Sequence, residues 1–171
     1  MRKVLVMGPS GAGKSTFARR LGGLTGLPIV YLDQHFWQPG WAMTPPAAWR
    51  RKVEALVAQP SWIMDGDYGS SLDLRIPAAD TIIYIVAPRW LCLSRVLMRS
   101  FRSYGKVRED LAPGCPEQFI TWDFFKYVWR YNSVKRPEIL ARLAGAEEKT
   151  TILTGAREMN AYLQKVTTSS E

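Results

Sequence analysis

The stretch Gly8-Pro9-Ser10-Gly11-Ala12-Gly13-Lys14-Ser15 decides the fold of this chain, because it fits the pattern G-x-x-x-x-G-K-[ST] at every fixed position. The apolar run Lys-Val-Leu-Val-Met at residues 3–7 precedes it and is typical of a buried parallel strand. After it, Phe17 and Leu21 stand four positions apart, which is the spacing of one helix face. A strand, a glycine-rich loop and a helix in this order are the context that the pattern requires, so we predict a loop that binds phosphate.

The residue types of this loop suit that chemistry. Its glycines permit backbone torsions that other residues avoid, and they leave no side chain between the amide groups and an anion. The amide groups form a nest for the anion, and the amino-terminal end of the next helix adds its positive dipole. Lys14 can reach the β- and γ-phosphates, and the Ser15 hydroxyl can bind Mg²⁺. We therefore expect ATP and Mg²⁺ as cofactors, with the nucleoside triphosphate held by Gly8, Pro9, Ser10, Gly11, Ala12, Gly13, Lys14, Ser15 and Thr16.

Length and composition predict one globular domain. The chain has 171 residues, of which 47% are hydrophobic, so it can bury a core, and we expect residues 1–171 to form a single domain. Its formal net charge of +8 suits a negatively charged partner, and a nucleotide and a nucleic acid both meet this condition. The two cysteines, Cys92 and Cys115, have no metal-type spacing, and the lone His35 excludes a metal site built from histidines.

The chain shows no sign of a membrane segment. No apolar run approaches the length of a membrane span, and the first predicted strand begins at residue 3. We therefore expect no signal peptide, no membrane contact and a cytoplasmic location. A monomer and a dimer are both open.

Apolar strands alternate with helical patterns along the sequence. The runs at residues 3–7, 29–32, 62–64, 81–86 and 150–153 predict five strands. Helices are expected at residues 45–58, with Thr44 as N-cap, and at residues 90–102, 117–133 and 156–166. This alternation indicates an α/β fold with a parallel sheet covered on both faces. Ligands of such sheets bind at the carboxyl ends of the strands.

Two aspartates stand at the ends of predicted strands. Asp33 follows the second strand, and Asp65 opens the turn Asp65-Gly66-Asp67-Tyr68-Gly69 after the third. A carboxylate at such a place can bind Mg²⁺ or orient an acceptor hydroxyl. We expect Asp65 to hold the metal together with Ser15, and Asp33 to act as a base or a substrate anchor, with Asp65 and Tyr68 also on the acceptor side. Each aspartate could instead cap a helix or a turn.

An insertion on the acceptor side is expected at residues 34–58. It contains Trp37, Trp41 and Trp49, which could stack on a base or cover an acceptor, or could form apolar packing over the sheet edge. Further along the chain, Arg75 is a candidate clamp for an acceptor anion. A salt bridge from Arg75 to Asp73 or Asp80 is the alternative.

Arginines in the second half of the chain are candidates for neutralising charge during phosphoryl transfer. Arg95 and Arg99 fall on one face of the helix predicted at 90–102, and Arg130 lies on the next predicted helix. Any of the three could serve, and a solvated basic face is the alternative. Between the two helices, residues 102–116 are rich in glycine and proline, which predicts a mobile lid that excludes water.

Seven segments together resemble the DNA topology modulation proteins, a family that is similar to adenylate kinases. They are residues 8–15, 32–41, 65–69, 72–75, 79–83, 88–92 and 114–117, and they recur in order over nearly the whole chain. The resemblance implies ATP binding and a P-loop NTPase fold of the nucleoside-monophosphate-kinase type, a three-layer sandwich with strand order 2-3-1-4-5. It also implies that Asp65 and Gly66 lie near Mg²⁺, and that Arg95 and Arg99 begin the lid. After Gly66 the chain has Asp67-Tyr68-Gly69, where adenylate kinases typically have Phe-Pro-Arg.

These observations favour a kinase that transfers the γ-phosphoryl group of ATP to a small-molecule or nucleotide acceptor. Lys14 would stabilise the transferred group, and Asp33 with Arg75 would position the acceptor. Two alternatives stay open. The first is a DNA-associated protein that uses ATP as a switch, for which the basic face and the aromatic residues of 122–131 are available, although these aromatics could equally pack a helix into the core. The second is an ATPase without an acceptor. Because no DNA-reading motif is visible, nucleic acid is not the favoured partner.

Overall fold

A parallel sheet forms the centre of the computed structural model, which describes residues 1–168. Within these residues the sheet has five strands, in the spatial order β2 (Ile29–Tyr31), β5 (Trp62–Asp65), β1 (Lys3–Met7), β6 (Thr81–Val86) and β7 (Thr150–Thr154). Counted along the chain, this is the order 2-3-1-4-5, so the predicted α/β architecture is confirmed. The short hairpin of β3 (Trp37–Gln38) and β4 (Ala42–Met43) is separate from this sheet.

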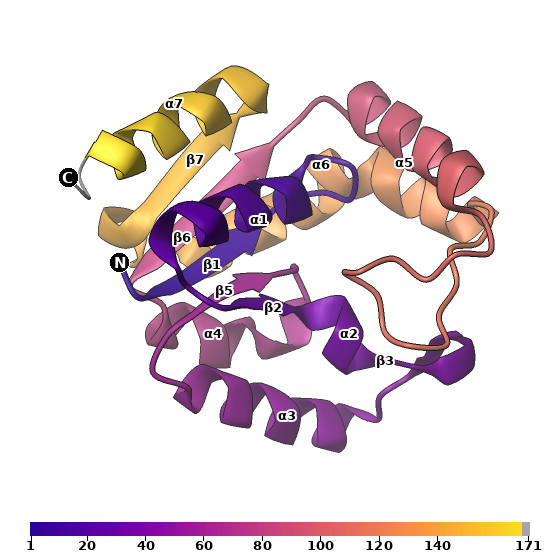
Figure 1. The fold of residues 1–171 in the computed structure, drawn as a ribbon, viewed down its shortest axis with the longest axis horizontal. Helices are drawn as coiled ribbons and strands as arrows, with labels where there is room; N and C mark the ends of the chain where they lie inside the picture. The colour runs from indigo at the N-terminus through magenta and orange to yellow at the C-terminus, as the bar shows by residue number, and fades with distance from the viewer. Residues whose placement is uncertain (169–171) are drawn as a thin grey trace.

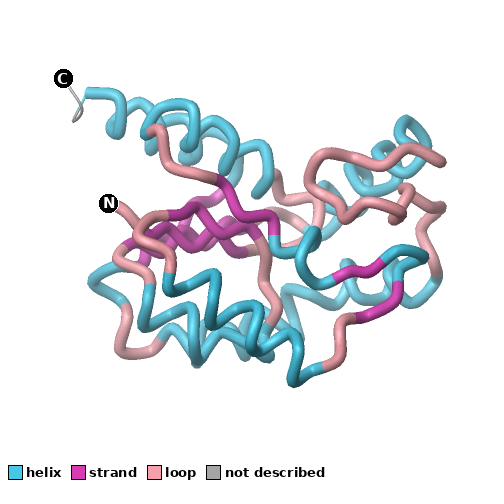
Figure 2. The backbone as a smooth tube through the Cα atoms, turned by 60° about the horizontal axis from the view of Figure 1, so that its bottom comes forward, coloured by secondary structure: helices cyan, strands magenta, loops and turns pink. Residues whose placement is uncertain are grey.

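The helices cover both faces of the sheet (Figures 1 and 2). One apolar cluster packs α1 (Lys14–Thr25), α5 (Arg89–Ser103) and α7 (Gly155–Thr168) against one face. A second cluster packs α3 (Pro46–Ala58), α4 (Leu72–Ala78) and α6 (Trp122–Leu143) against the other. Neighbouring residues of a strand point to opposite faces, so Leu5 belongs to one cluster and Val6 to the other. The result is the predicted three-layer sandwich.

The register of the central strands brings two candidate segments together. Val6 of β1 lies beside Asp65 of β5, and Met7, the last residue of β1, lies beside Tyr84 of β6. The loop that follows β1 therefore starts next to the carboxyl end of β5. Because all strands run parallel, their polar ends gather at one edge of the sheet.

The helices of the structure differ in part from those predicted. The helix expected at 117–133 is α6, which begins after the Thr121 N-cap and continues past Pro137 to Leu143. Thr44 does not cap α3, because Pro45 is the N-cap and the Thr44 hydroxyl donates to the Phe36 carbonyl at 2.6 Å. Sequence periodicity missed α2 (Leu32–Phe36) and α4, since five and seven residues are too few to show a helical repeat.

The segment between α5 and α6, residues 104–121, contacts the residues that follow β2. The Gly40 amide donates to the Gly114 carbonyl at 2.9 Å, and the Trp41 indole Nε1–H donates to the Pro116 carbonyl at 3.0 Å. In Figure 1 this loop passes beside α2 and β3. The segments predicted as a lid and as an acceptor-side insertion are therefore in contact. Among the described residues, no helix is both long and apolar enough to cross a membrane.

Candidate active site

The glycine-rich loop turns tightly between β1 and α1. A Cβ atom at Gly8 would lie 2.3 Å from the carbonyl oxygen of Ile85, and one at Gly11 would lie 2.3 Å from that of Cys92. Both glycines have φ in the left-handed range, at 137° and 83°. A side chain at either position would collide with the backbone of β6 or α5. The loop therefore stays in close contact with β6 and α5 before α1 begins at Lys14.

Asp65 lies at the end of β5 and carries a buried carboxylate. Its residue is 6% exposed, and its Oδ1 atom has no hydrogen-bond partner among the described residues. Burial raises the pKa of Asp65 to about 6, although the Lys14 ammonium and the Ser15 hydroxyl favour the charged form. An unpartnered carboxylate oxygen beside a serine hydroxyl is the donor set that Mg²⁺ prefers, so these residues fit a magnesium site.

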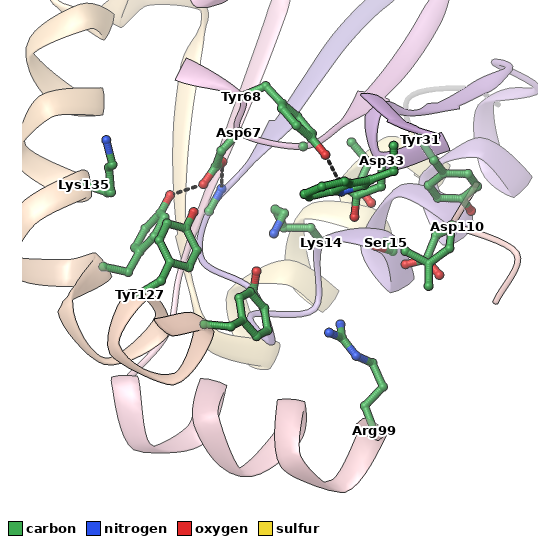
Figure 3. Close-up of a pocket in the computed structure, with 18 of the residues that line it drawn as sticks. Lys14, Ser15, Tyr31, Asp33, Asp67, Tyr68, Arg99, Asp110, Tyr127 and Lys135 are labelled. Atoms are coloured by element: carbon green, nitrogen blue, oxygen red, sulfur yellow. Dashed lines mark hydrogen bonds between the residues drawn. The ribbon is translucent and has the colours of Figure 1, made fainter. Parts of the chain in front are cut away.

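A cavity of about 630 Å³ opens at this edge of the sheet. The loop after β1, the ends of β2 and β5, helices α5 and α6, and the 104–121 segment all contribute to its wall (Figure 3). It brings together these residues predicted from the sequence: Gly8, Ser10, Lys14, Ser15, Asp33, Asp65, Tyr68 and Arg99. The predicted arginines Arg75, Arg95 and Arg130 do not line it. Neither do five predicted residues of the glycine-rich loop: Pro9, Gly11, Ala12, Gly13 and Thr16.

Asp33 and Tyr68 form a pair in the wall of the cavity. The Tyr68 hydroxyl donates to Asp33 Oδ1, as Figure 3 shows. Burial raises the pKa of Asp33, while this hydrogen bond and the Lys14 charge lower it. Tyr68 has a φ of 32°, a left-handed value that is strained for a residue with a side chain. Its ring packs against Phe36 and Trp49, with centroids 4.7 and 5.0 Å away, which holds the hydroxyl over Asp33.

Arg75 supports this turn from behind the cavity. It is fully buried, and its guanidinium donates to the carbonyls of Gly66 at 2.9 Å, Tyr68 at 2.8 Å and Asp67. Burial lowers the pKa of Arg75 to about 10. The structure therefore does not support Arg75 as an acceptor clamp. The alternative of a salt bridge is also wrong, since Asp73 pairs with Arg50 at 2.8 Å and Asp80 accepts from the Lys3 amide at 2.9 Å.

The candidate arginines take three different positions. Arg99 reaches from α5 toward Lys14 and Ser15 (Figure 3). Arg95, one turn earlier, has its Nη1 3.3 and 3.4 Å from the carbonyls of Gly11 and Ala12, so it braces the outside of the loop. Arg130 is exposed on α6, because the face of α6 that lines the cavity carries residues at four-residue spacing, Tyr127, Tyr131 and Lys135.

The three tryptophans of the insertion divide between cavity and core. Trp37 and Trp41 line the cavity, with their ring centroids 5.4 Å apart. Trp49 is 2% exposed and belongs to the core cluster beneath α3. The packing role is therefore present at Trp49, whereas covering an acceptor stays a prediction for Trp37 and Trp41.

Asp67 is a cavity residue to which the sequence interpretation assigned no role. Its Oδ1 accepts from the Gly8 amide at 2.8 Å, and its Oδ2 accepts from the Tyr131 hydroxyl. The side chain thus ties the start of the phosphate loop to α6. The sequence feature that could have identified Asp67 as a site residue is its carboxylate two positions after Asp65, in the same turn. No feature of the sequence predicts the contact between Asp67 and Tyr131, because the two residues are 64 positions apart.

Comparison with solved structures identifies the fold. A gluconokinase from Sinorhizobium meliloti 1021 matches with a TM-score of 0.56 and 16% identity, over 99% of this chain and 95% of that one. A shikimate kinase from Acinetobacter baumannii, solved in complex with shikimate, matches with a TM-score of 0.60 and 16% identity, over 97% and 90%. The chain has the fold of P-loop kinases.

Sequence comparison adds no family to this result. No family model matches the chain, and no curated protein matches it. The resemblance to the DNA topology modulation proteins therefore stays a prediction. At 16% identity, the likeness to the two kinases shows the fold alone.

Proposed function

We propose that the chain is a kinase that transfers the γ-phosphoryl group of MgATP to a small acceptor. The observation that carries the proposal is the buried Oδ1 of Asp65, which has no partner within residues 1–168 and lies in one cavity with the phosphate-loop residues Lys14 and Ser15. A buried carboxylate oxygen without a partner is costly unless a ligand satisfies it. A magnesium ion that also contacts nucleotide phosphates is such a ligand.

The loop residues 8–16 are the proposed site for the phosphates of ATP. The loop amides and Lys14 would bind them, and Ser15 with Asp65 would hold Mg²⁺ directly or through its water. The metal would neutralise charge that builds up on the phosphates. Arg99 would add a second positive charge from the opposite wall of the cavity.

Asp33 is the proposed partner of the acceptor hydroxyl. Its Oδ1 is engaged by Tyr68, so the other oxygen is available to accept a proton from the acceptor. The raised pKa of Asp33 moves it toward the range in which a base works at neutral pH. Trp37 and Trp41 border this side of the cavity and would exclude water from the reacting groups.

A screen for ADP release tests the proposal. MgATP is supplied together with nucleosides, nucleotides and small alcohols, and MgGTP is tested in parallel. We expect ADP release that depends on one class of acceptor and that Lys14→Ala abolishes. Full activity of Lys14→Ala would contradict the proposal, as would calorimetry that detects no binding of either triphosphate to the wild-type chain.

The same assay separates the alternatives. ADP release that needs no added acceptor would indicate an ATPase. Tight DNA binding that weakens strongly between two salt concentrations, measured by filter binding, would favour a DNA-associated protein.

A further inference from the structure

Glu117 is a buried carboxylate at the neck of the 104–121 segment. It is 6% exposed and lines the same cavity as Lys14. Its backbone joins the two arms of the segment, because its carbonyl accepts from the Gly105 amide and its amide donates to the Lys106 carbonyl, both at 2.9 Å. These backbone hydrogen bonds fix the position of Glu117, so its side chain is not needed to hold the two arms together and can contact other residues.

Two arginines flank this carboxylate. Glu117 Oε2 lies 2.8 Å from Arg108 Nε, and Oε1 lies 3.4 Å from Arg99 Nε and 3.5 Å from Ser100 Oγ. Arg99 belongs to α5, whereas Arg108 belongs to the segment itself. Burial lowers the pKa of Arg99, and the Arg108 charge lowers it further, so the two guanidinium groups repel one another. The carboxylate between them offsets this repulsion.

The contacts leave the outer ends of the guanidinium groups for a ligand. Glu117 meets both arginines at Nε, on the side of the chain stem. Among the described residues, the Nη atoms of Arg99 have no partner, and Arg108 Nη1 lies 3.4 Å from Asp110 Oδ2. Figure 3 shows the Arg99 guanidinium facing Lys14 and Ser15.

We propose that Glu117 is a positioning residue that holds Arg99 and Arg108 with their Nη atoms toward the transferred phosphoryl group. This inference rests on the proposed kinase function. A guanidinium that is already aligned stabilises developing charge without reorganising during the reaction. Glu117 itself touches no reacting atom, and its effect passes through the two arginines.

The variant Glu117→Gln separates positioning from a purely structural role. It keeps the size of the side chain and the backbone contacts, but removes the charge. Loss of a negative charge near the cavity does not weaken the binding of an anionic nucleotide, whereas loss of alignment slows transfer. We expect unchanged or tighter binding of the MgAMP-PNP analogue, together with a kcat lowered about 10- to 100-fold.

The experiment measures ADP release at saturating MgATP, with the acceptor that the screen identifies or with water, and MgAMP-PNP binding by calorimetry. Glu54→Gln is the matched control, because Glu54 also pairs with an arginine Nε, that of Arg50 at 3.5 Å, but on the exposed surface of α3. It should leave both quantities unchanged. Glu117→Asp, which keeps the charge on a shorter stem, should recover part of the lost kcat.

A double-mutant cycle tests the route of the effect. In the background Arg99→Met with Arg108→Met, Glu117→Gln should cause no further loss of kcat. Should Glu117→Gln fail to melt cooperatively, Arg108→Lys takes its place, since lysine keeps the charge but lacks the Nε contact, and it should lower kcat without weakening analogue binding.

The outcomes distinguish a failure of the proposed role of Glu117 from a failure of the proposed kinase function. A wild-type chain that binds no MgAMP-PNP, or binds it and releases no ADP, overturns the kinase function itself. If the wild-type chain is an active kinase, two results would overturn the role of Glu117 alone. The first is a kcat of Glu117→Gln within twofold of the wild-type value. The second is a loss of MgAMP-PNP affinity in Glu117→Gln as large as its loss of kcat.

Discussion

Asp65 and Asp33 are carboxylates at neighbouring strand ends with different surroundings. Tyr68 satisfies one oxygen of Asp33, whereas Asp65 Oδ1 is buried and has no partner in the part of the chain that the structure describes. Both residues are aspartates, and each lies at or just after the end of a strand, so the sequence alone does not distinguish them. Their hydrogen bonds assign Asp65 to the proposed metal and Asp33 to the proposed acceptor.

The buried charge of Asp65 predicts a dependence of folding stability on pH. Its pKa rises from 3.8 to about 6 on folding, so the folded state binds the proton more tightly than the unfolded state. Stability that is present below pH 4 is therefore lost as the pH rises through about 6, by about 3 kcal/mol. Urea unfolding of the nucleotide-free chain at pH 5 and pH 8 measures the part of this loss that falls above pH 5, which is about 1.4 kcal/mol.

Asp65→Asn is the control for this prediction. It removes the titrating group, so the variant should lose less stability than the wild type between the two pH values and should be the more stable protein at pH 8. MgATP should restore stability to the wild type at pH 8 but not to the variant, because metal binding favours the carboxylate. An equal pH dependence in both proteins would contradict the assignment.

At the scale of elements, the phosphate loop and the turn after β5 are held by backbone contacts. The loop passes so close to β6 and α5 that glycine is required at positions 8 and 11. The turn at residues 66–68 takes a strained conformation that the buried Arg75 holds through three carbonyls. In each case a neighbouring element determines the shape of a short segment.

Two glycine substitutions test the loop geometry. Gly11→Ala places a Cβ 2.3 Å from the Cys92 carbonyl at a φ of 83°, so we expect lost MgAMP-PNP binding and a destabilisation of more than about 1 kcal/mol. Gly23→Ala is the control, because a Cβ atom at this position of α1 would meet no described atom within 4 Å outside the backbone of its own helix, and it should stabilise the fold by about 0.5–1 kcal/mol. Calorimetry and urea unfolding measure both effects, and normal binding by Gly11→Ala would refute the loop geometry.

Arg75→Met tests the support of the turn. Leaving buried carbonyls unpaired costs about 1–3 kcal/mol each, so we expect a loss of about 3 kcal/mol or more, together with a lower kcat because Tyr68 is no longer held over Asp33. The control Arg50→Met breaks an exposed ion pair and should cost about 1 kcal/mol or less. A variant that stays stable but shows a raised acceptor KM would restore the anion-clamp interpretation.

At the scale of the whole molecule, the cavity is closed by contact between segments far apart in the chain. Trp41 and Gly40 meet the 104–121 segment at Pro116 and Gly114. Both segments contribute residues to the wall of the cavity. Opening of this contact is the motion that would admit substrates, as the predicted lid requires.

Trp41→Phe tests this contact. The variant keeps an aromatic ring but loses the hydrogen bond from the indole to the Pro116 carbonyl, which contributes about 1 kcal/mol. We expect trypsin to cleave at the exposed Lys106 about fivefold faster, as followed by mass spectrometry, since 1 kcal/mol is about fivefold in the open population. Trp90→Phe, on the exposed surface of α5, is the control. Equal cleavage rates in the two variants would show that the contact does not hold the segment.

The sequence by itself determined the elements whose signal is local. The octet at 8–15, the apolar runs of the five strands and the aspartates at the ends of β2 and β5 are each read from a few adjacent residues. Together they predicted the parallel sheet and part of the candidate site, whereas the order of the strands was implied by the resemblance to the DNA topology modulation proteins. Such patterns are readable because backbone torsion, strand burial and loop chemistry depend on neighbours in the chain.

Only the tertiary structure decided which of the many charged side chains share the cavity. It placed Arg75 behind the turn, Arg95 outside the loop and Arg130 on the solvent side of α6, and it brought Glu117 between Arg99 and Arg108. These outcomes depend on where α6 begins and how the 104–121 segment folds back. The sequence around a charged residue does not predict which face of the molecule it lies on or which residues it contacts, because packing between distant elements sets both.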